Sequence, residues 1–161
     1  GSQAKKDGFV QIMKYFEETA EHERILAKQL LKRLKGGQVE ITAAFSAEPI
    51  GTTQENLKAA ADAKHRLWAE LYPAYAETAL EEGLESIAKL FEAIGRAERF
   101  HWQRYSGLLK NVENETVFKK DEPVVWVCQK CGYTHEGTEA PAGCPACAHP
   151  RAHFEIFVQN W

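Results

Sequence analysis

The sequence predicts a mainly α-helical bundle followed by a small metal-binding module. Apolar residues recur at helical spacing through the first 112 residues, where proline occurs only at Pro49 and Pro73. All four cysteines, by contrast, fall between Cys128 and Cys147. The length of 161 residues suits one helical domain with a small appendage better than two full-sized domains. We therefore expect a helical domain over residues 1–112, a linker over 113–123 and a metal domain over 124–161.

The first helix is expected over residues 6–34. Gly36 and Gly37 follow it and favour the left-handed conformation that ends helices, and Asp7 is a candidate for its N-cap. Its apolar side chains form one broad stripe that we expect to be buried. The stripe comprises Phe9, Ile12, Met13, Phe16, Ala20, Ile25, Leu30 and Leu34.

Two further helices are expected over residues 54–82 and 84–111. Thr52 and Glu55 have the spacing of a capping box, which marks the start of the second helix. Pro73 cannot donate a backbone hydrogen bond to the preceding turn, so a kink is expected there. The stripe of the third helix, also expected to be buried, comprises Ile87, Leu90, Phe91, Ile94, Phe100, Tyr105 and Leu108.

The composition excludes several classes of protein. Lys and Arg total 20 against 23 Asp and Glu, so the net charge of −3 favours neither nucleic acid nor a membrane surface as a partner. Apolar residues make up 44% of the chain, which excludes a disordered class. Apolar runs such as 124–128 are far shorter than the roughly 20 residues that span a bilayer. We expect a cytoplasmic protein, and Gly1-Ser2 resembles the scar of a cleaved expression tag.

An internal repeat relates the first and third helices. At an offset of 75 residues the sequence matches itself at seven positions on helical spacing. A helix of about 28 residues precedes the second copy, and no counterpart precedes the first copy in this sequence. We therefore expect an apolar groove that is covered by a partner or by a second copy of the chain, most simply in a homodimer. The matched pairs are Gly8 with Gly83, Ile12 with Ile87, Lys14 with Lys89, Phe16 with Phe91, Glu17 with Glu92, Glu23 with Glu98 and Arg24 with Arg99.

The four cysteines form the strongest chemical signal. They make two Cys-x-x-Cys pairs, Cys128 with Cys131 and Cys144 with Cys147, separated by 12 residues. Two such knuckles can place four thiolates tetrahedrally around one metal ion. Zinc and iron both accept this ligand set, so the spacing alone leaves a structural zinc site and a redox iron site open. Disulfides are disfavoured because every cysteine has metal-ligand spacing.

A second candidate site lies on the helices. Glu98-x-x-His101 places a carboxylate and an imidazole on one helix face, as carboxylate-bridged di-metal bundles do. In the first copy of the repeat the same positions hold Glu23 and Leu26, so one ligand is lost there. A mononuclear site of Glu23, Glu98 and His101 is one interpretation, and a buried Glu–His pair without metal is the other. His22 is disfavoured as a ligand because its side chain should point about 100° away from that of Glu23.

Several motifs together resemble one known family. The chain looks like rubrerythrin, a non-haem iron protein with a ferritin-like bundle and a rubredoxin-like tail. The resemblance implies a ferritin-like bundle short of one helix, and a tail in which Cys128, Cys131, Cys144 and Cys147 bind one iron. In the family this iron passes electrons, drawn from NADH, to a di-iron centre that reduces hydrogen peroxide under oxidative stress. The motifs are QAKKDGFVQI (3–12), IGTT (50–53), ELYP (70–73), VFKK (117–120), CGYTHEG (131–137) and CPACAHP (144–150).

The di-iron ligands of the family carry over only in part. Glu23, Glu98 and His101 keep three of its seven ligand positions, and the family's first helix has no counterpart. Lysine at one of the lost positions would place a cation where two metal ions need anionic oxygens. His65 beside it offers no replacement. The three departures within the chain are Leu26, Lys64 and Leu67.

Three hypotheses follow from the sequence. The first is an electron-transfer protein with iron, or zinc as a substitute, at the four cysteines and an inactive di-iron site, to which we assign no catalytic residue. An electron-donor protein would be its partner, together with a second copy of the chain. The second is a working peroxidase whose missing ligands come from another chain. The third is an engineered binding or assembly scaffold made from a truncated member of the family.

Overall fold

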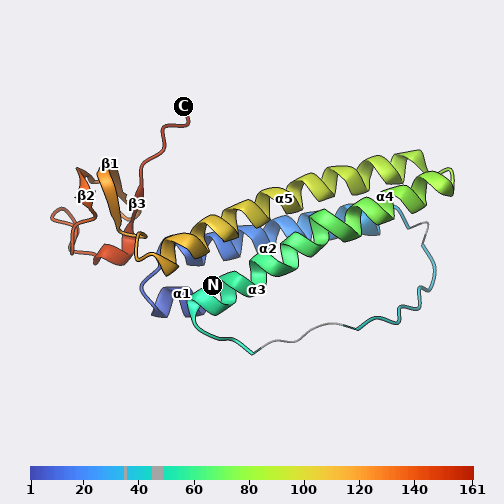
Figure 1. The fold of residues 1–161 in the computed structure, drawn as a ribbon, viewed down its shortest axis with the longest axis horizontal. Coiled ribbons are helices and arrows are strands. Elements are labelled where there is room, and N and C mark those ends of the chain that lie inside the picture. The colour runs from blue at the N-terminus through green and yellow to red at the C-terminus, as the bar shows by residue number, and fades with distance from the viewer. Residues whose placement is uncertain (35, 45–48) are drawn as a thin grey trace.

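The computed structural model describes residues 1–34, 36–44 and 49–161 of the chain. It contains a long helical bundle and a small β-sheet module at one end of it (Figure 1). The predicted class, mainly helical with a small C-terminal β module, is confirmed. None of the described helices is long and apolar enough to cross a membrane.

Among the described residues, five α-helices and one π turn build the bundle. The long helix α5 packs along α3 and α4, which run end to end through the π turn η1. The helices expected over residues 6–34, 54–82 and 84–111 correspond to α2, to α3 with η1 and α4, and to α5, whereas the short helix α1 was not expected. The elements are α1 (Ser2–Lys6), α2 (Val10–Leu31), α3 (Thr53–Arg66), η1 (Leu67–Leu71), α4 (Tyr72–Glu81) and α5 (Glu85–Glu113).

The break between α1 and α2 corrects the expected start at residue 6. Gly8 has φ 85°, and Gly83 between α4 and α5 has φ 72°, so each ends a helix in the left-handed region. The two turns share their hydrogen bonds: the Phe9 N–H donates to Ala4 O, the Leu84 N–H donates to Ala79 O, and both distances are 2.7 Å. The repeat predicted from the sequence is therefore present in the backbone of both turns.

Asp7 does not cap the N-terminus of the first long helix as expected, since α2 begins at Val10 with Phe9 as its N-cap. Asp7 ends α1, and its carboxylate accepts hydrogen bonds from the Thr53 hydroxyl at 2.6 Å and the Thr53 N–H at 3.1 Å. The predicted capping box is confirmed, because the Thr52 side chain accepts from the Glu55 N–H and the Glu55 carboxylate accepts from the Thr52 N–H. The hydrogen bonds between Asp7 and Thr53 hold the start of α3 against the end of α1.

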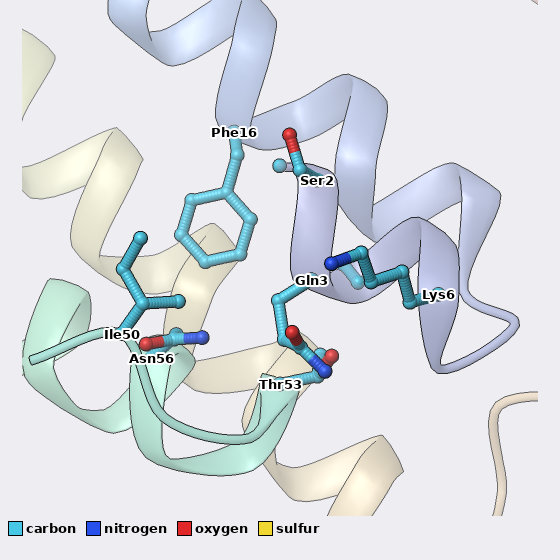
Figure 2. A pocket seen from close by; sticks show the side chains of 9 residues that line it. Ser2, Gln3, Lys6, Phe16, Ile50, Thr53 and Asn56 are labelled. Carbon is cyan, nitrogen blue, oxygen red and sulfur yellow. The ribbon is translucent and has the colours of Figure 1, made fainter.

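The helical core lies at the end of the bundle nearest the β module. Ile12, Leu57, Tyr105 and Leu108 are buried there, and the Phe16 ring packs on Tyr105 with centroids 5.1 Å apart. A cavity of about 420 Å³ opens between α1, α2 and the start of α3, with Phe16 and Ile50 among its lining residues (Figure 2). Its lining contains no carboxylate, histidine or cysteine, so it is not a candidate metal centre.

Parts of the predicted apolar stripes are exposed. Ile25, Leu34 and Phe100 were expected in the core, and their exposed fractions are 44%, 51% and 53%. Ile25 on α2 and Phe100 on α5 leave more than a third of their surface exposed, and Leu34 lies beyond the end of α2 at Leu31. The expectation of burial is wrong for these three residues and for Ala20, which is also exposed. The expected association of the chain through its bundle stays a prediction.

The β module is a three-stranded antiparallel sheet in the order β2-β1-β3. Its strands are β1 (Lys119–Cys128), β2 (Thr134–Glu139) and β3 (Phe154–Ile156), preceded by the short helix η2 (Arg151–His153). Because β1 pairs with β2 already at Lys119, the sheet begins within the expected linker. Trp126 and Phe154 are fully buried, and the Trp126 indole donates to Gly137 O at 3.0 Å. Together with Cys128 and Cys144 they form the core of the module.

Candidate metal centres

The four cysteines gather at one end of the sheet. One sulfur from each of Cys128, Cys131, Cys144 and Cys147 lies within 4.8 Å of the other three. Across the two knuckles, Cys128 Sγ lies 3.7 Å from Cys147 Sγ, and Cys131 Sγ lies 3.5 Å from Cys144 Sγ. The cluster predicted from the spacing is therefore formed in the fold.

The two knuckles have the same backbone course. In the first, the Gly132 N–H donates to Cys128 O at 2.9 Å, and in the second the Ala148 N–H donates to Cys144 O at 2.8 Å. Both residues after the second cysteine have positive φ, 77° at Gly132 and 58° at Ala148. Glycine adopts this conformation freely, whereas alanine does so at a cost in free energy. Other contacts of the second knuckle must therefore offset that cost at Ala148. The turns direct backbone N–H groups at the sulfurs, as metal knuckles require.

Backbone N–H groups favour the ionised form of one thiol. Burial opposes ionisation of Cys144, but the N–H groups of Ala146 and Cys147 outweigh it and lower its pKa to about 7. At Cys131 the Tyr133 N–H lowers the pKa, but hydrogen bonds with the neighbouring thiols outweigh it and raise that pKa to about 12. Metals bind the thiolate and not the thiol, so the lowered pKa favours coordination by Cys144 in particular.

The sulfur geometry fits one tetrahedral metal ion. A metal–sulfur bond of roughly 2.3 Å in a regular tetrahedron separates the sulfurs by about 3.8 Å. The two distances between the knuckles, 3.7 and 3.5 Å, are close to that value. Cys128 and Cys144 are buried beside Trp126 and Phe154, so most of one side of the cluster is shielded from water.

A second cluster lies in the helical bundle, where three helices meet. Glu23 comes from α2, Lys64 from α3, and Glu98 and His101 from α5. Glu98 is fully buried and His101 is 2% exposed, whereas Glu23 is 39% exposed. One ligand atom from each of Glu23, Glu98 and His101 lies within 4.8 Å of the other two. The three ligands retained from the family pattern are thus brought together.

Lys64 occupies the centre of this cluster. Its ammonium donates a hydrogen bond to Glu23 Oε1 at 2.5 Å and lies 2.8 Å from Glu98 Oε2. His101 Nδ1 is 3.3 Å from Glu23 Oε1 and 3.5 Å from Glu98 Oε2. The expected Glu–His pair is therefore a four-residue cluster in which the lysine makes the closest contacts with both carboxylates.

The charges of the cluster stabilise one another. Burial raises the pKa of Glu23, but His101 and Lys64 outweigh it and lower that pKa to about 2. Burial lowers the pKa of Lys64, and the carboxylates of Glu23 and Glu98 outweigh it and raise that pKa above its ordinary value. The pKa of His101 is raised by the same two carboxylates against the effect of burial. Both anions thus have a cation within contact distance.

This arrangement does not fit a di-metal centre. Two divalent ions need several carboxylates to balance their charge, and the cluster offers two, both in contact with the Lys64 ammonium. At the other two altered positions, Leu26 and Leu67 are half-buried apolar side chains without ligand atoms. The sequence prediction that Lys64 places a cation in this site is confirmed.

His22 joins the cluster from outside, which the sequence analysis did not expect. Its Nδ1 lies 3.2 Å from His101 Nε2, with the two rings stacked, and its Nε2 lies 3.7 Å from Glu18. Neighbouring residues on a helix such as α2 are about 100° apart around its axis. The His101 ring, however, reaches across from α5 to the face on which His22 lies, and sequence periodicity carries no signal for that contact.

Comparison with known proteins gives a consistent picture. The family model "Rubrerythrin" matches residues 1–109, and the model "Rubrerythrin, rubredoxin-like domain" matches residues 126–155. Rubrerythrin of Nitratidesulfovibrio vulgaris is 51% identical over 161 residues, covering 100% of this chain and 84% of the relative. Rubrerythrin of Porphyromonas gingivalis is 49% identical and is covered to 80%. A structure of fully reduced, all-ferrous nigerythrin matches with a TM-score of 0.60 at 28% identity, over 97% of this chain and 75% of that one.

Proposed function

Because this chain belongs to the rubrerythrin family, we propose that it is an iron electron-transfer protein whose redox centre is held by Cys128, Cys131, Cys144 and Cys147. The observation that carries the proposal is the clustering of the four sulfurs within 4.8 Å of one another. An iron ion bound by four thiolates exchanges one electron between its ferric and ferrous forms.

The side chains around the cysteines are suited to this role. Trp126 and Phe154 exclude water from the buried side of the cluster, so solvent screens a change in the charge of the metal centre only weakly. Cys131 is exposed, which leaves an edge of the centre open to an electron donor or acceptor. The N–H groups of the knuckles lower the cost of the negative charge on the sulfurs. A structural zinc site needs only the shielding and not the open edge.

Peroxide reduction by a di-iron centre is not part of the proposed function. The contacts of the Lys64 ammonium with both Glu23 and Glu98 argue against two metal ions there. In this proposal the helical domain serves as the scaffold of the cysteine centre.

The test is reversible reduction of the iron-loaded protein. We expect ferric thiolate absorption that disappears on adding dithionite and returns on oxidation, with one electron taken up for each bound iron. Cys144→Ser should abolish this signal, whereas Glu136→Gln, an exposed change in the same module, should leave it unchanged. A protein that binds only zinc, or whose absorption does not respond to reduction, would contradict the proposal.

A further inference from the structure

The position of Lys64 points to a role beyond the electron-transfer function. We propose that Lys64 is a built-in cation that closes a latent mononuclear site for a divalent metal, formed by Glu23, Glu98 and His101. The ammonium occupies the position between the two carboxylates that such a metal would take. This inference concerns the helical domain alone and does not rest on the metal at the cysteines.

The first support is the geometry of the ligand atoms. The oxygens of Glu23 and Glu98 and a nitrogen of His101 lie within 4.8 Å of one another, on two helices that face each other. A divalent ion bonded to oxygen and nitrogen at about 2.0–2.2 Å brings its ligands to comparable separations. Lys64 Nζ lies 2.5 Å from one of these oxygens and 2.8 Å from the other, so ammonium and metal compete for the same space.

The second support is a set of buried polar atoms that have ion-pair contacts within the cluster but no aligned hydrogen bond among the described residues. Glu98 is fully buried, and neither of its carboxylate oxygens has an aligned hydrogen-bond donor among the described residues. His101 Nδ1 is likewise buried without an aligned partner in the described part of the chain. Buried polar atoms almost always find partners, and these three point into one cluster. A metal ion would satisfy an oxygen of Glu98 and the His101 nitrogen at once.

Charge explains why the native cluster rejects the metal. The Lys64 ammonium is 12% exposed and lies 2.5 Å from Glu23 Oε1 and 2.8 Å from Glu98 Oε2. A divalent ion bonded to the same two oxygens would lie only a few ångströms from that positive charge, in a partly buried site where repulsion is strong. Leu26 and Leu67 supply no additional ligand, which limits the latent site to one ion.

His22 provides the outer contact that such a site requires. A metal-bound histidine commonly donates its second ring N–H to a neighbouring acceptor, which fixes the ring and the tautomer. With His101 Nδ1 facing the carboxylates, its Nε2 faces His22 Nδ1 at 3.2 Å. The chain therefore contains the outer contact that such a site needs.

The experiment compares metal uptake before and after removal of the ammonium. The cysteine site is first filled with iron, and Co²⁺ or Zn²⁺ is then titrated by calorimetry, with elemental analysis of the product. We expect the native protein to take up no second metal. Lys64→Ala should bind one additional ion at least about a hundredfold more tightly, because the repelling charge is gone. Lys58→Ala, an exposed lysine on the same helix that pairs with Asp62, is the matched control and should behave as native.

Further variants separate this site from the cysteine centre. Co²⁺ bound to Lys64→Ala should show ligand-field bands without thiolate charge transfer. The double variant Lys64→Ala with Glu98→Gln should not bind this ion. Replacing His22 by alanine in the Lys64→Ala background should weaken binding roughly 10- to 100-fold. If Lys64→Ala does not fold, Lys64→Gln removes the charge while keeping most of the stem, and the same uptake is expected of it.

Two results would overturn the inference. One is uptake of a second, thiolate-independent metal ion by the native protein, since Lys64 would then not close the site. The other is a folded Lys64 variant that binds no additional ion. Failure of the electron-transfer proposal would be seen separately, in the iron absorption and reduction of the cysteine centre, which these variants do not touch.

Discussion

Removal of the Lys64 ammonium without added metal should destabilise the helical domain. In Lys64→Met the aliphatic stem is kept, and among the described residues the fully buried Glu98 keeps only His101 as a cationic neighbour. Removing one partner of a buried ion pair costs about 3–5 kcal/mol. Glu23 is 39% exposed, so water screens its charge and its loss of a partner adds little. We therefore expect a cost of about 3 kcal/mol, at the lower end of that range, because methionine repacks readily.

The assay is urea unfolding in the presence of a chelator that strips divalent ions from the helices, followed by far-ultraviolet circular dichroism. In thermal unfolding of a chain of this size, a loss of about 3 kcal/mol corresponds to a Tm that is lower by about 6–12 °C. Adding Glu98→Gln to Lys64→Met removes the stranded carboxylate and should recover more than half of the lost stability. A cost below about 1 kcal/mol, or additive effects of the two substitutions, would refute the reasoning that Lys64 and Glu98 depend on each other.

The other predictions concern the metal module, the contact between α1 and α3, and the assembly. Phe154→Ala should cost about 3–5 kcal/mol, because this fully buried ring lies in a very small core. The measurement is the rate at which the protein loses iron to a chelator. Phe154→Ala should lose iron faster than the control Phe157→Ala, and equal rates would count against this prediction. Asp7→Ala should cost about 1 kcal/mol at neutral pH, because two hydrogen bonds from Thr53 are lost. The pKa of Asp7 is lowered mainly by the Thr53 hydroxyl, so its stabilisation is present above the unfolded value of 3.8 and is lost as the pH falls through the folded pKa. Acid titrations of native and Asp7→Ala protein should converge at low pH, and a constant difference would disagree. Association through the bundle predicts a concentration-dependent sedimentation coefficient, and a monomer at all concentrations would exclude it.

Local patterns predicted their parts of the fold well. The capping box at Thr52 and Glu55 and the two cysteine knuckles depend on residues three or four positions apart, so their geometry is set by the chain next to them. The break at Gly8 was missed because apolar residues keep helical spacing across it. The repeat contained the missing signal, since its partner Gly83 was correctly taken as the end of a helix.

Contacts between helices were predicted less completely. The sequence placed the Lys64 charge at the helical site, but the bridging of Glu23 and Glu98 depends on how α2, α3 and α5 pack. The contact of His22 with His101 depends on the same packing, because it joins residues 79 positions apart. Periodicity within one helix defines which face a residue occupies, and leaves open what a neighbouring helix brings to that face.

We expect the chain to hold one redox metal at its cysteines and none among its helices. The most direct test is the iron content for each chain, measured by elemental analysis against amino-acid analysis, before and after ferrous iron is added. We predict about one iron for each chain in both cases, as four cysteines bind a single ion. A content of about three, with two ions taken up by the helices as in di-iron bundles, would contradict the account.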